Sequence, residues 1–282
     1  MRLPYIKKGR SINDTIDAMS FSKKQSNPRP RTVAIVQARM ASSRLPGKVL
    51  ATIGSRPMLA WVVERTRRAK HVDDVIVATT TAESDAPVAD YCRSAGYPVF
   101  RGSPLDVLDR FYQAALIYKA QVIVRLTADC PFIDPQEIDR VVTVFQEKEV
   151  DFAANRLPPP WKRTFPIGLD TEVCSFAALE RAWKETGQLH DREHVMPYLY
   201  EVEGRFKVWV VEHEPGYGHI RWTVDAPPDL ELVRQVAVYF DGRDDFTWYE
   251  VLALFEQHPE LAQINAGVAH KRGDDVDERM KT

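Results

Sequence analysis

The sequence predicts an α/β fold with a Rossmann-like, mostly parallel sheet that is flanked by helices and carries an inserted arm. Two observations support this class. Short apolar runs rich in β-branched residues, such as 32–36 (TVAIV), read as buried strands, and they alternate with amphipathic segments of helical period. This alternation implies right-handed βαβ crossovers, which build a parallel sheet. Because ligands bind where the strands of such sheets end, we expect functional residues directly after the strands.

The first half of the chain supplies most of the expected elements in a regular order. Pro57 suits the first turn of a helix because its φ is already helical. Gly96 suits the end of another helix. Strands are expected at 32–36, 75–78, 99–100, 121–126 and 152–154. Helices are expected at 57–66, 83–95, 104–119 and 135–147.

The regular order changes after residue 156. The segment of about 156–214 opens with three prolines and a tryptophan (158–161), which predicts an arm or lid that carries acceptor contacts. Helices near 175–186 and 192–200 are expected to follow it. We expect a strand pair at 206–211 and 219–224 to return to the sheet, and helices starting at Pro228 and Thr247 to close the domain.

One domain, residues 32–265, is expected between two tails. The N-terminal tail, residues 1–31, is rich in Lys and Arg and has only Asp14 and Asp17 as acidic residues, so we predict a basic, flexible segment. A weak electrostatic contact with a partner is the alternative for this tail. The C-terminal tail, residues 266–282, is charged and almost without large apolar residues.

The composition excludes several functional classes. With 282 residues, 44% of them hydrophobic, the chain can bury a substantial core. A net charge of −2 gives no reason to expect nucleic acid as a partner, and no apolar run approaches the roughly 20 residues that span a bilayer. Cys92, Cys130 and Cys174 are far apart and odd in number, which favours buried core thiols in a cytoplasmic protein over a disulfide framework.

The loop after the first strand, residues 37–48, combines three cations with two hydroxyls and a Pro-Gly turn. A triphosphate needs such a set, because backbone N–H groups and hydroxyls surround it while cations balance its charge. A solvated basic turn is the alternative. The loop matches neither the Walker pattern nor the dinucleotide-binding glycine pattern. The candidate nucleotide-binding residues in it are Ala38, Arg39, Ser42, Ser43, Arg44 and Lys48.

Two aspartates follow strands in the same way. Asp129 comes just after the strand 121–126, where a carboxylate suits a hard divalent cation, although a turn aspartate before Pro131 is the alternative. Asp225 also follows an expected strand, and Asp229 has the position of a helix cap. Asp225 is therefore the second metal candidate.

These motifs together resemble the acylneuraminate and deoxy-octulosonate (KDO) cytidylyltransferases. The similarity extends over residues 32–240 and is strongest to the branch named after spore coat polysaccharide biosynthesis protein F. The segments that carry it are 37–48, 125–131, 221–229, 100–112 (FRGSPLDVLDRFY), 168–172 (GLDTE) and 192–198 (REHVMPY).

The resemblance implies a sheet of the nucleotide-diphospho-sugar transferase type, CTP as nucleotide, Mg²⁺ as cofactor and a homodimer. It implies that Thr79 and Arg101 frame cytosine and ribose, and that Asp129 and Asp225 hold the metal. It places Arg192 and His194 beside the acceptor. Arg39 and Lys48 join the two aspartates as catalytic candidates. The remaining acceptor candidates are Asp106, which could equally cap a helix, Arg125, Asp170 and Glu172.

The predicted reaction is Mg²⁺-dependent transfer of CMP from CTP to a small acidic acceptor, with release of pyrophosphate, in surface-glycan or related biosynthesis. The acceptor could be a sugar acid, a phosphonate or a phosphorylated small molecule. One alternative is a glycosyltransferase that uses a nucleotide sugar, although Asp129 is followed by Cys130-Pro131 rather than completing an Asp-x-Asp pair. A non-catalytic nucleotide-binding regulator is the other, but it would have no reason to keep both carboxylates and all three cations.

Overall fold

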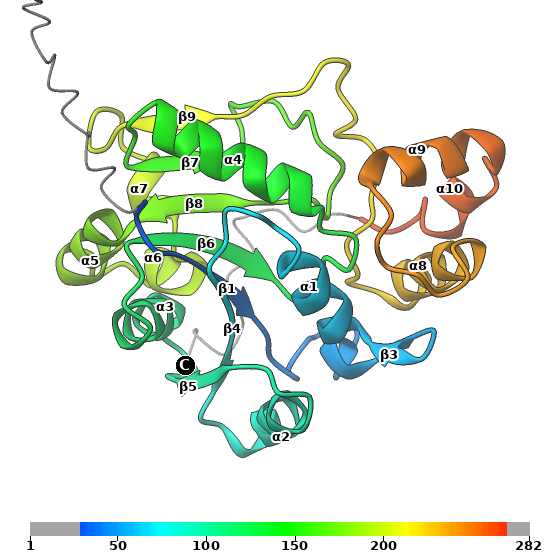
Figure 1. The fold of residues 1–282 in the computed structure, drawn as a ribbon, viewed down its shortest axis with the longest axis horizontal. Helices are drawn as coiled ribbons and strands as arrows, with labels where there is room; N and C mark the ends of the chain where they lie inside the picture. Colours follow the sequence, from blue (N-terminus) through cyan, green and yellow to red (C-terminus); the bar gives the residue numbers. More distant parts are fainter. Residues whose placement is uncertain (1–28, 270–282) are drawn as a thin grey trace, which may run out of the picture.

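A seven-stranded sheet forms the centre of the computed structural model, which describes residues 29–269 (Figure 1). Its strands are β1 (Thr32–Gln37), β4 (Asp74–Thr80), β5 (Val99–Gly102), β6 (Val122–Thr127), β7 (Phe152–Ala154), β8 (Glu172–Ser175) and β9 (Val208–Val210). They lie in the order β5-β4-β1-β6-β8-β7-β9, and only β8 runs antiparallel to its neighbours. The predicted mostly parallel sheet is confirmed.

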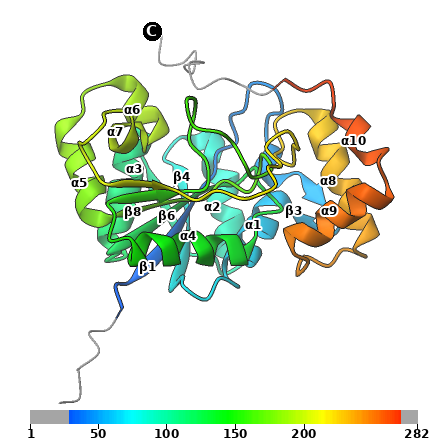
Figure 2. The same ribbon diagram turned by 90° about the horizontal axis from the view of Figure 1, so that it is seen from above.

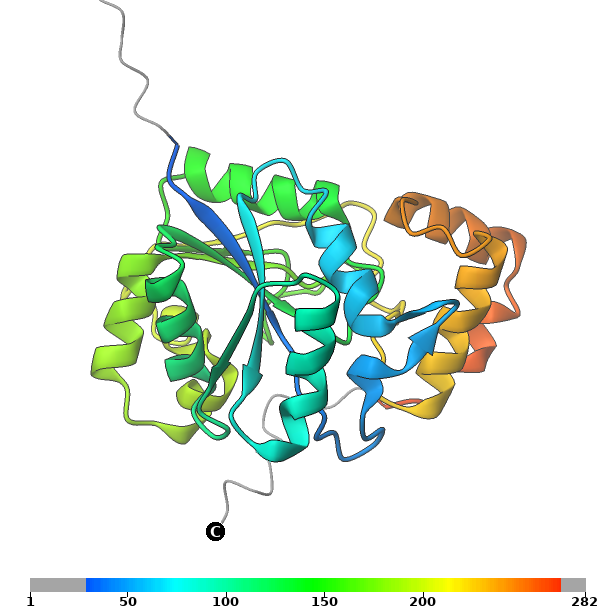
Figure 3. The same cartoon turned by 60° about the horizontal axis from the view of Figure 1, so that its bottom comes forward.

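Helices cover both faces of this sheet (Figure 2). One face carries α1 (Met58–Thr66), α2 (Ala86–Ser94) and α4 (Pro135–Glu147). The other carries α3 (Val107–Ile117), α5 (Phe176–Glu185), α6 (Leu189–His194) and α7 (Pro197–Tyr200). Beside the sheet lie α8 (Pro227–Tyr239), α9 (Trp248–Gln257) and α10 (Leu261–Ile264), with α8 against the small hairpin of β2 (Thr52–Ile53) and β3 (Arg56–Pro57) (Figure 3). Single turns η1 (Lys48–Leu50) and η2 (Glu83–Asp85) complete the described elements.

The central strand β1 is buried on both faces. Val33 and Ile35 pack into the core beneath α3 and α5, whereas Ala34 and Val36 pack into the core beneath α1 and α4. Successive side chains of a strand point to opposite faces, so a strand covered on both sides must be apolar at every position. This explains the continuous apolar run from which the strand was predicted.

In the second half of the chain one element was missed and two expectations were wrong. The strand β8, between β6 and β7, was not predicted. The segment 219–224 forms no strand. It makes one isolated bridge, between Ile167 and Arg221, in which Trp222 donates to the Ile167 carbonyl, and Val224 donates to a different loop at the Asp129 carbonyl. The expected helix 192–200 is divided into α6 and α7, because the backbone has a φ of 72° at Val195.

The predicted tails lie mostly outside the described residues, which exclude 1–28 and 270–282. Arg29 and Arg31, which were assigned to the N-terminal tail, form ion pairs with Asp73 and Asp74 at the start of β4. Within residues 29–269, no helix has the length and apolar character of a membrane span. The expectation that the cysteines are buried thiols rather than a disulfide framework is confirmed, since all three are buried and free.

Candidate active site

The phosphate loop, residues 38–47, joins β1 to η1 and is fixed at its start, middle and end. The Ala38 N–H donates to the Ala78 carbonyl at 3.1 Å, and the Met40 N–H donates to Asp85 Oδ1 at 2.6 Å. Gly47 closes the loop by donating its N–H to the Met40 carbonyl at 2.8 Å. The φ of Gly47 is 72°, a conformation that glycine adopts without steric cost.

Asp85 is a loop anchor that the sequence analysis missed. Its side chain is buried and accepts hydrogen bonds from the Met40 N–H and the Thr80 hydroxyl, so it ties the phosphate loop to the end of β4. Asp85 directly precedes Ala86 and Pro87, close to where a helix is expected to begin, so the sequence gives no sign of a role other than helix capping.

A hollow of about 210 Å³ opens at the carboxyl ends of β1 and β6. All the predicted phosphate-loop ligands line it except Ala38, whose side chain is buried in the core. The two predicted metal ligands, Asp129 and Asp225, line it as well. The predicted residues that the hollow brings together are Arg39, Ser42, Ser43, Arg44, Lys48, Asp129 and Asp225.

Lys48 joins the two aspartates. Its Nζ donates to Asp129 Oδ2 at 2.8 Å, to Asp225 Oδ1 at 2.9 Å and to the Val224 carbonyl at 2.8 Å. Burial of Lys48 lowers its pKa, but attraction to the two carboxylates outweighs burial and leaves the pKa above its ordinary value. The ammonium is therefore charged and shared between both carboxylates.

Asp225 contacts two further cations, the guanidinium groups of Arg221 and Arg44. Its Oδ2 lies 2.8 Å from Arg221 Nη2 and 2.9 Å from Arg44 Nη2. Burial raises the pKa of Asp225, but Lys48, Arg221 and Arg44 together hold it well below the ordinary carboxyl range. Arg44 also donates to the Ala269 carbonyl at 3.1 Å, so the last described residue lies beside the phosphate loop.

The donor set fits a hard divalent cation. Asp129 and Asp225 converge on one positive charge, the Lys48 ammonium, and present oxygen ligands of the kind that Mg²⁺ prefers. Within residues 29–269 no group of three or more His, Cys, Asp or Glu side chains has metal-site geometry. Such a pair of carboxylates is typical of a magnesium ion that is also held by substrate phosphates and water.

Asp229 caps α8, as predicted. Its Oδ2 accepts from the N–H groups of Asp225 at 2.9 Å and Ala226 at 3.0 Å. The side chain is fully buried and forms two further hydrogen bonds with Arg221, which also contacts Asp225. The cap is thus part of the network that surrounds the metal candidate.

A second group of polar side chains lies between β6, β8 and α6. Arg125 forms an ion pair with Glu172, its register partner on β8, and contacts Gln37 Oε1 at 3.4 Å. His194 Nε2 is buried and has no hydrogen-bond partner in the described part of the chain. Burial and, to a smaller extent, repulsion from His190, Arg125, Arg156 and Arg39 together lower the pKa of His194 to about 4. His194 is therefore neutral at pH 7.

The other acceptor candidates form pairs. Asp106 caps α3 by accepting the Asp109 N–H at 2.8 Å, which confirms its capping role, and its carboxylate also lies 3.3 Å from Arg192 Nη1. Asp170 accepts two hydrogen bonds from Arg163 on the predicted arm, at 2.5 and 3.0 Å. None of these residues lines the hollow.

Thr79 and Arg101 also lie away from the hollow. They are register partners on β4 and β5. Arg101 donates to the carbonyls of Thr80 at 2.8 Å and Ala82 at 2.9 Å. Thr79 is fully buried, and its hydroxyl finds no hydrogen-bond partner among residues 29–269. Their contact with cytosine and ribose stays a prediction.

Comparison with known proteins identifies relatives over almost the whole described chain. Residues 33–265 match the family model described as cytidylyltransferase. An uncharacterized protein of Methanocaldococcus jannaschii is 37% identical over 88% of this chain and all of its own length. Spore coat polysaccharide biosynthesis protein SpsF of Bacillus subtilis is 32% identical over 81% of this chain and 95% of its own. A 3-deoxy-manno-octulosonate cytidylyltransferase of Psychrobacter is 31% identical over 76% of this chain and 84% of its own.

A solved structure extends the similarity to the fold. A cytidylyltransferase from Leptospira borgpetersenii superposes with a TM-score of 0.79 and 31% identity, covering 86% of this chain and all of that one. The predicted resemblance is confirmed by both comparisons.

Proposed function

The chain belongs to the cytidylyltransferase family, and we propose that it transfers CMP from CTP to a small acidic acceptor with Mg²⁺ as cofactor. The observation that carries the proposal is the convergence of two carboxylates and the cations of the phosphate loop on one hollow at the ends of β1 and β6. Membership of this family favours nucleotidyl transfer over the glycosyltransferase and regulator alternatives.

In the proposed reaction an acceptor oxygen attacks the α-phosphorus of CTP in line, and the bond from that phosphorus to the bridging oxygen breaks to release pyrophosphate. Such transfers depend on positioning and charge neutralisation. Arg39, Arg44 and Lys48 would balance the charge that builds on the leaving pyrophosphate. Asp129 and Asp225 would hold Mg²⁺, which supplies a Lewis acid at the phosphate oxygens.

The polar group around His194 favours an acidic acceptor. Three guanidinium groups, those of Arg125, Arg156 and Arg39, lie near enough to His194 to lower its pKa, and burial of the imidazole lowers it as well. Arginine pairs bidentately with carboxylate and phosphate oxygens, so an anion is the natural occupant. The names of two relatives refer to a sugar acid and to a spore coat polysaccharide. We therefore propose surface-glycan or related biosynthesis for this chain too. The proposed working form is a cytoplasmic homodimer.

The test is release of pyrophosphate from CTP with a panel of acceptors that includes a 2-keto sugar acid, a phosphonate and a sugar phosphate. We expect turnover with an acidic acceptor, loss of turnover in EDTA, and CTP bound at least tenfold better than ATP or GTP, about 1.4 kcal/mol. A preference for a purine nucleotide would refute the cytidylyl assignment.

The metal role has its own test. Asp129→Asn and Asp225→Asn should each lower turnover by about two orders of magnitude or more, because each removes charge from the magnesium site. Asp90→Asn, on the exposed face of α2, is the matched control and should retain wild-type turnover. A variant of Asp129 or Asp225 with near-normal activity at saturating Mg²⁺ would exclude that residue as a ligand.

A further inference from the structure

A buried carboxylate lies behind the metal candidate. Asp229 is fully buried, and five hydrogen bonds converge on it. Three come from the side chains of Arg221 and Asn265, and two come from the backbone at the start of α8. A buried charge is tolerated only when hydrogen bonds satisfy it, so this set of donors holds Asp229 in one place.

This network fixes Asp225 at both ends. Asp229 Oδ2 accepts the Asp225 backbone N–H at 2.9 Å, and Arg221, held by Asp229 at 2.9 and 3.1 Å, donates to Asp225 Oδ2 at 2.8 Å. The direction of the Asp225 carboxylate therefore depends on where Arg221 lies, together with the contacts from Lys48 and Arg44. Partners of a ligand side chain that orient it in this way commonly change metal affinity by about 10–100-fold when they are removed.

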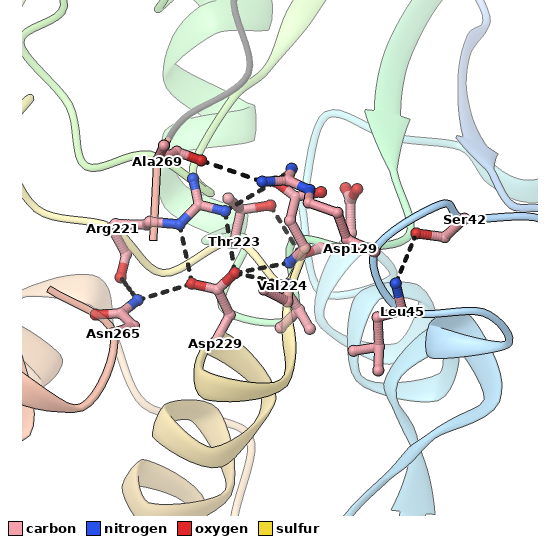
Figure 4. A network of polar contacts seen from close by, with 12 residues as sticks. Ser42, Leu45, Asp129, Arg221, Thr223, Val224, Asp229, Asn265 and Ala269 are labelled. Atoms are coloured by element: carbon pink, nitrogen blue, oxygen red, sulfur yellow. Dashed lines mark hydrogen bonds and ion pairs between the residues drawn. The ribbon is translucent and has the colours of Figure 1, made fainter. Parts of the chain in front are cut away.

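Asn265 is the outermost member of this network. It follows α10 and is 6% exposed, and its Nδ2 donates both to Asp229 Oδ1 at 2.9 Å and to the Arg221 carbonyl at 3.2 Å. One amide group, which follows a helix more than 30 residues further along the chain, thus contacts both Asp229 and Arg221 (Figure 4).

Loss of this amide would affect the network unevenly. Asp229 Oδ1 would keep only Arg221 Nε, and the Arg221 backbone would lose its contact with the segment after α10. Arg221 would then be held less firmly while its other nitrogen still contacts Asp225. A shift of Arg221 would in turn change the position of the Asp225 carboxylate. Asn265 itself does not line the hollow, so its effect on Asp225 would be indirect.

We propose that Asn265 is a positioning residue for Asp225 and acts through Asp229 and Arg221. The inference rests on the proposed role of Asp225 at the metal. It assigns a function in metal binding to a residue at the C-terminal boundary of the family match, far in sequence from either carboxylate.

The experiment measures binding rather than turnover. Mn²⁺ affinity is determined by electron paramagnetic resonance with CTP present and acceptor absent, for the full-length wild type, Asn265→Leu, Asn265→Ser and Asp225→Asn. Leu has the same branched arrangement of heavy atoms as Asn and removes the donor, whereas Ser retains a hydroxyl. Gln263→Leu, on the exposed side of α10, is the matched control. CTP affinity without metal and the urea midpoint are recorded for each.

We expect Asn265→Leu to bind Mn²⁺ about tenfold more weakly. Asn265→Ser should lose less, while CTP affinity without metal is unchanged in both and the control matches the wild type. If Asn265→Leu does not fold, the Ser variant alone must show the weaker Mn²⁺ affinity. Wild-type Mn²⁺ affinity in the folded Asn265 variants would overturn the inference and leave the proposed function intact, provided that Asp225→Asn loses Mn²⁺. Wild-type Mn²⁺ affinity in Asp225→Asn would instead overturn the metal role of Asp225 and the inference with it.

Discussion

Replacement of Lys48 by Met tests the ion pairs at the centre of the hollow. Met has a similar length and no charge, so it removes the ammonium while filling the same volume. In the wild type this ammonium is about one-tenth exposed and lies 2.8 and 2.9 Å from the carboxylates of Asp129 and Asp225. The variant leaves two carboxylates facing one another without the cation between them.

The expected loss of stability is about 3 kcal/mol. Removal of one partner from a buried pair costs roughly 3–5 kcal/mol, because the remaining charge is uncompensated. The lower end applies here, since Arg44 and Arg221 still contact Asp225. Turnover should fall by about 10²–10³-fold, the cost of removing one group that stabilises charge in the transition state.

The pH dependence of this loss has a definite sign. The pKa of Asp225 lies below the ordinary 3.8 when folded, so its stabilisation is present above 3.8 and disappears as pH falls through the folded pKa. The pKa of Lys48 lies above 10.5 when folded, so its stabilisation is present below 10.5 and disappears as pH rises through the folded pKa. The difference between wild type and Lys48→Met should therefore be constant from about pH 5 to pH 9.

Urea denaturation with and without Mg²⁺ provides the assay. A cation that binds only the folded state stabilises it, and the variant offers the vacant pair of carboxylates. Mg²⁺ alone should thus raise the urea midpoint of Lys48→Met more than that of the wild type, while the exposed control Lys70→Met behaves like the wild type. Equal midpoints for Lys48→Met and wild type, with no difference in their response to Mg²⁺, would refute the reasoning.

Three further predictions follow from individual contacts. Gly168→Ala should cost about 2 kcal/mol more than Gly204→Ala in urea denaturation. Both have positive φ, but only at Gly168 would a Cβ meet backbone, 2.7 Å from the Thr223 nitrogen; equal midpoints would contradict this. The folded pKa of His194 is about 4 against an ordinary 6.5, so the free energy of unfolding should fall as pH drops from about 6.5 to 4. If NMR shows that His194 titrates near pH 6.5, its imidazole is not buried as described. Arg192→Ala should raise the KM for the acceptor far more than that for CTP, and the reverse pattern would move Arg192 to the nucleotide side.

The sequence predicted those elements whose signal is local. The strand β1 and its parallel neighbours carry apolar runs because helices cover both their faces. The strand β8 has only four residues, Glu172–Ser175, with polar residues at both ends. It is defined by pairing with β6 and β7, which is a long-range property. In the segment 219–224 the opposite occurred, since a strand-like pattern exists but its N–H groups bond to two separate loops.

The same distinction applies to the site. Arg39 and Asp129 could be predicted because they closely follow strands, where parallel sheets bind ligands, and Lys48 because it ends the loop that leaves β1. The pairing of Lys48 with Asp129 and Asp225 joins positions 81 and 177 residues apart, and no local pattern indicates it. Asn265 carries no chemical signal of its own and gains a role only through the buried carboxylate beside it.

These pairings give the proposed reaction a consequence for binding. Lys48, Arg44 and Arg221 are all paired with carboxylates in the structure, so the charges of the hollow largely neutralise one another. In the proposed reaction a triphosphate would attract Lys48 and Arg44 away from Asp129 and Asp225, and the carboxylates that they leave would favour a divalent cation. The cation would in turn favour release of the two side chains toward the phosphates. Because coupling between two ligands is reciprocal, CTP must strengthen metal binding by the same factor as the metal strengthens CTP binding.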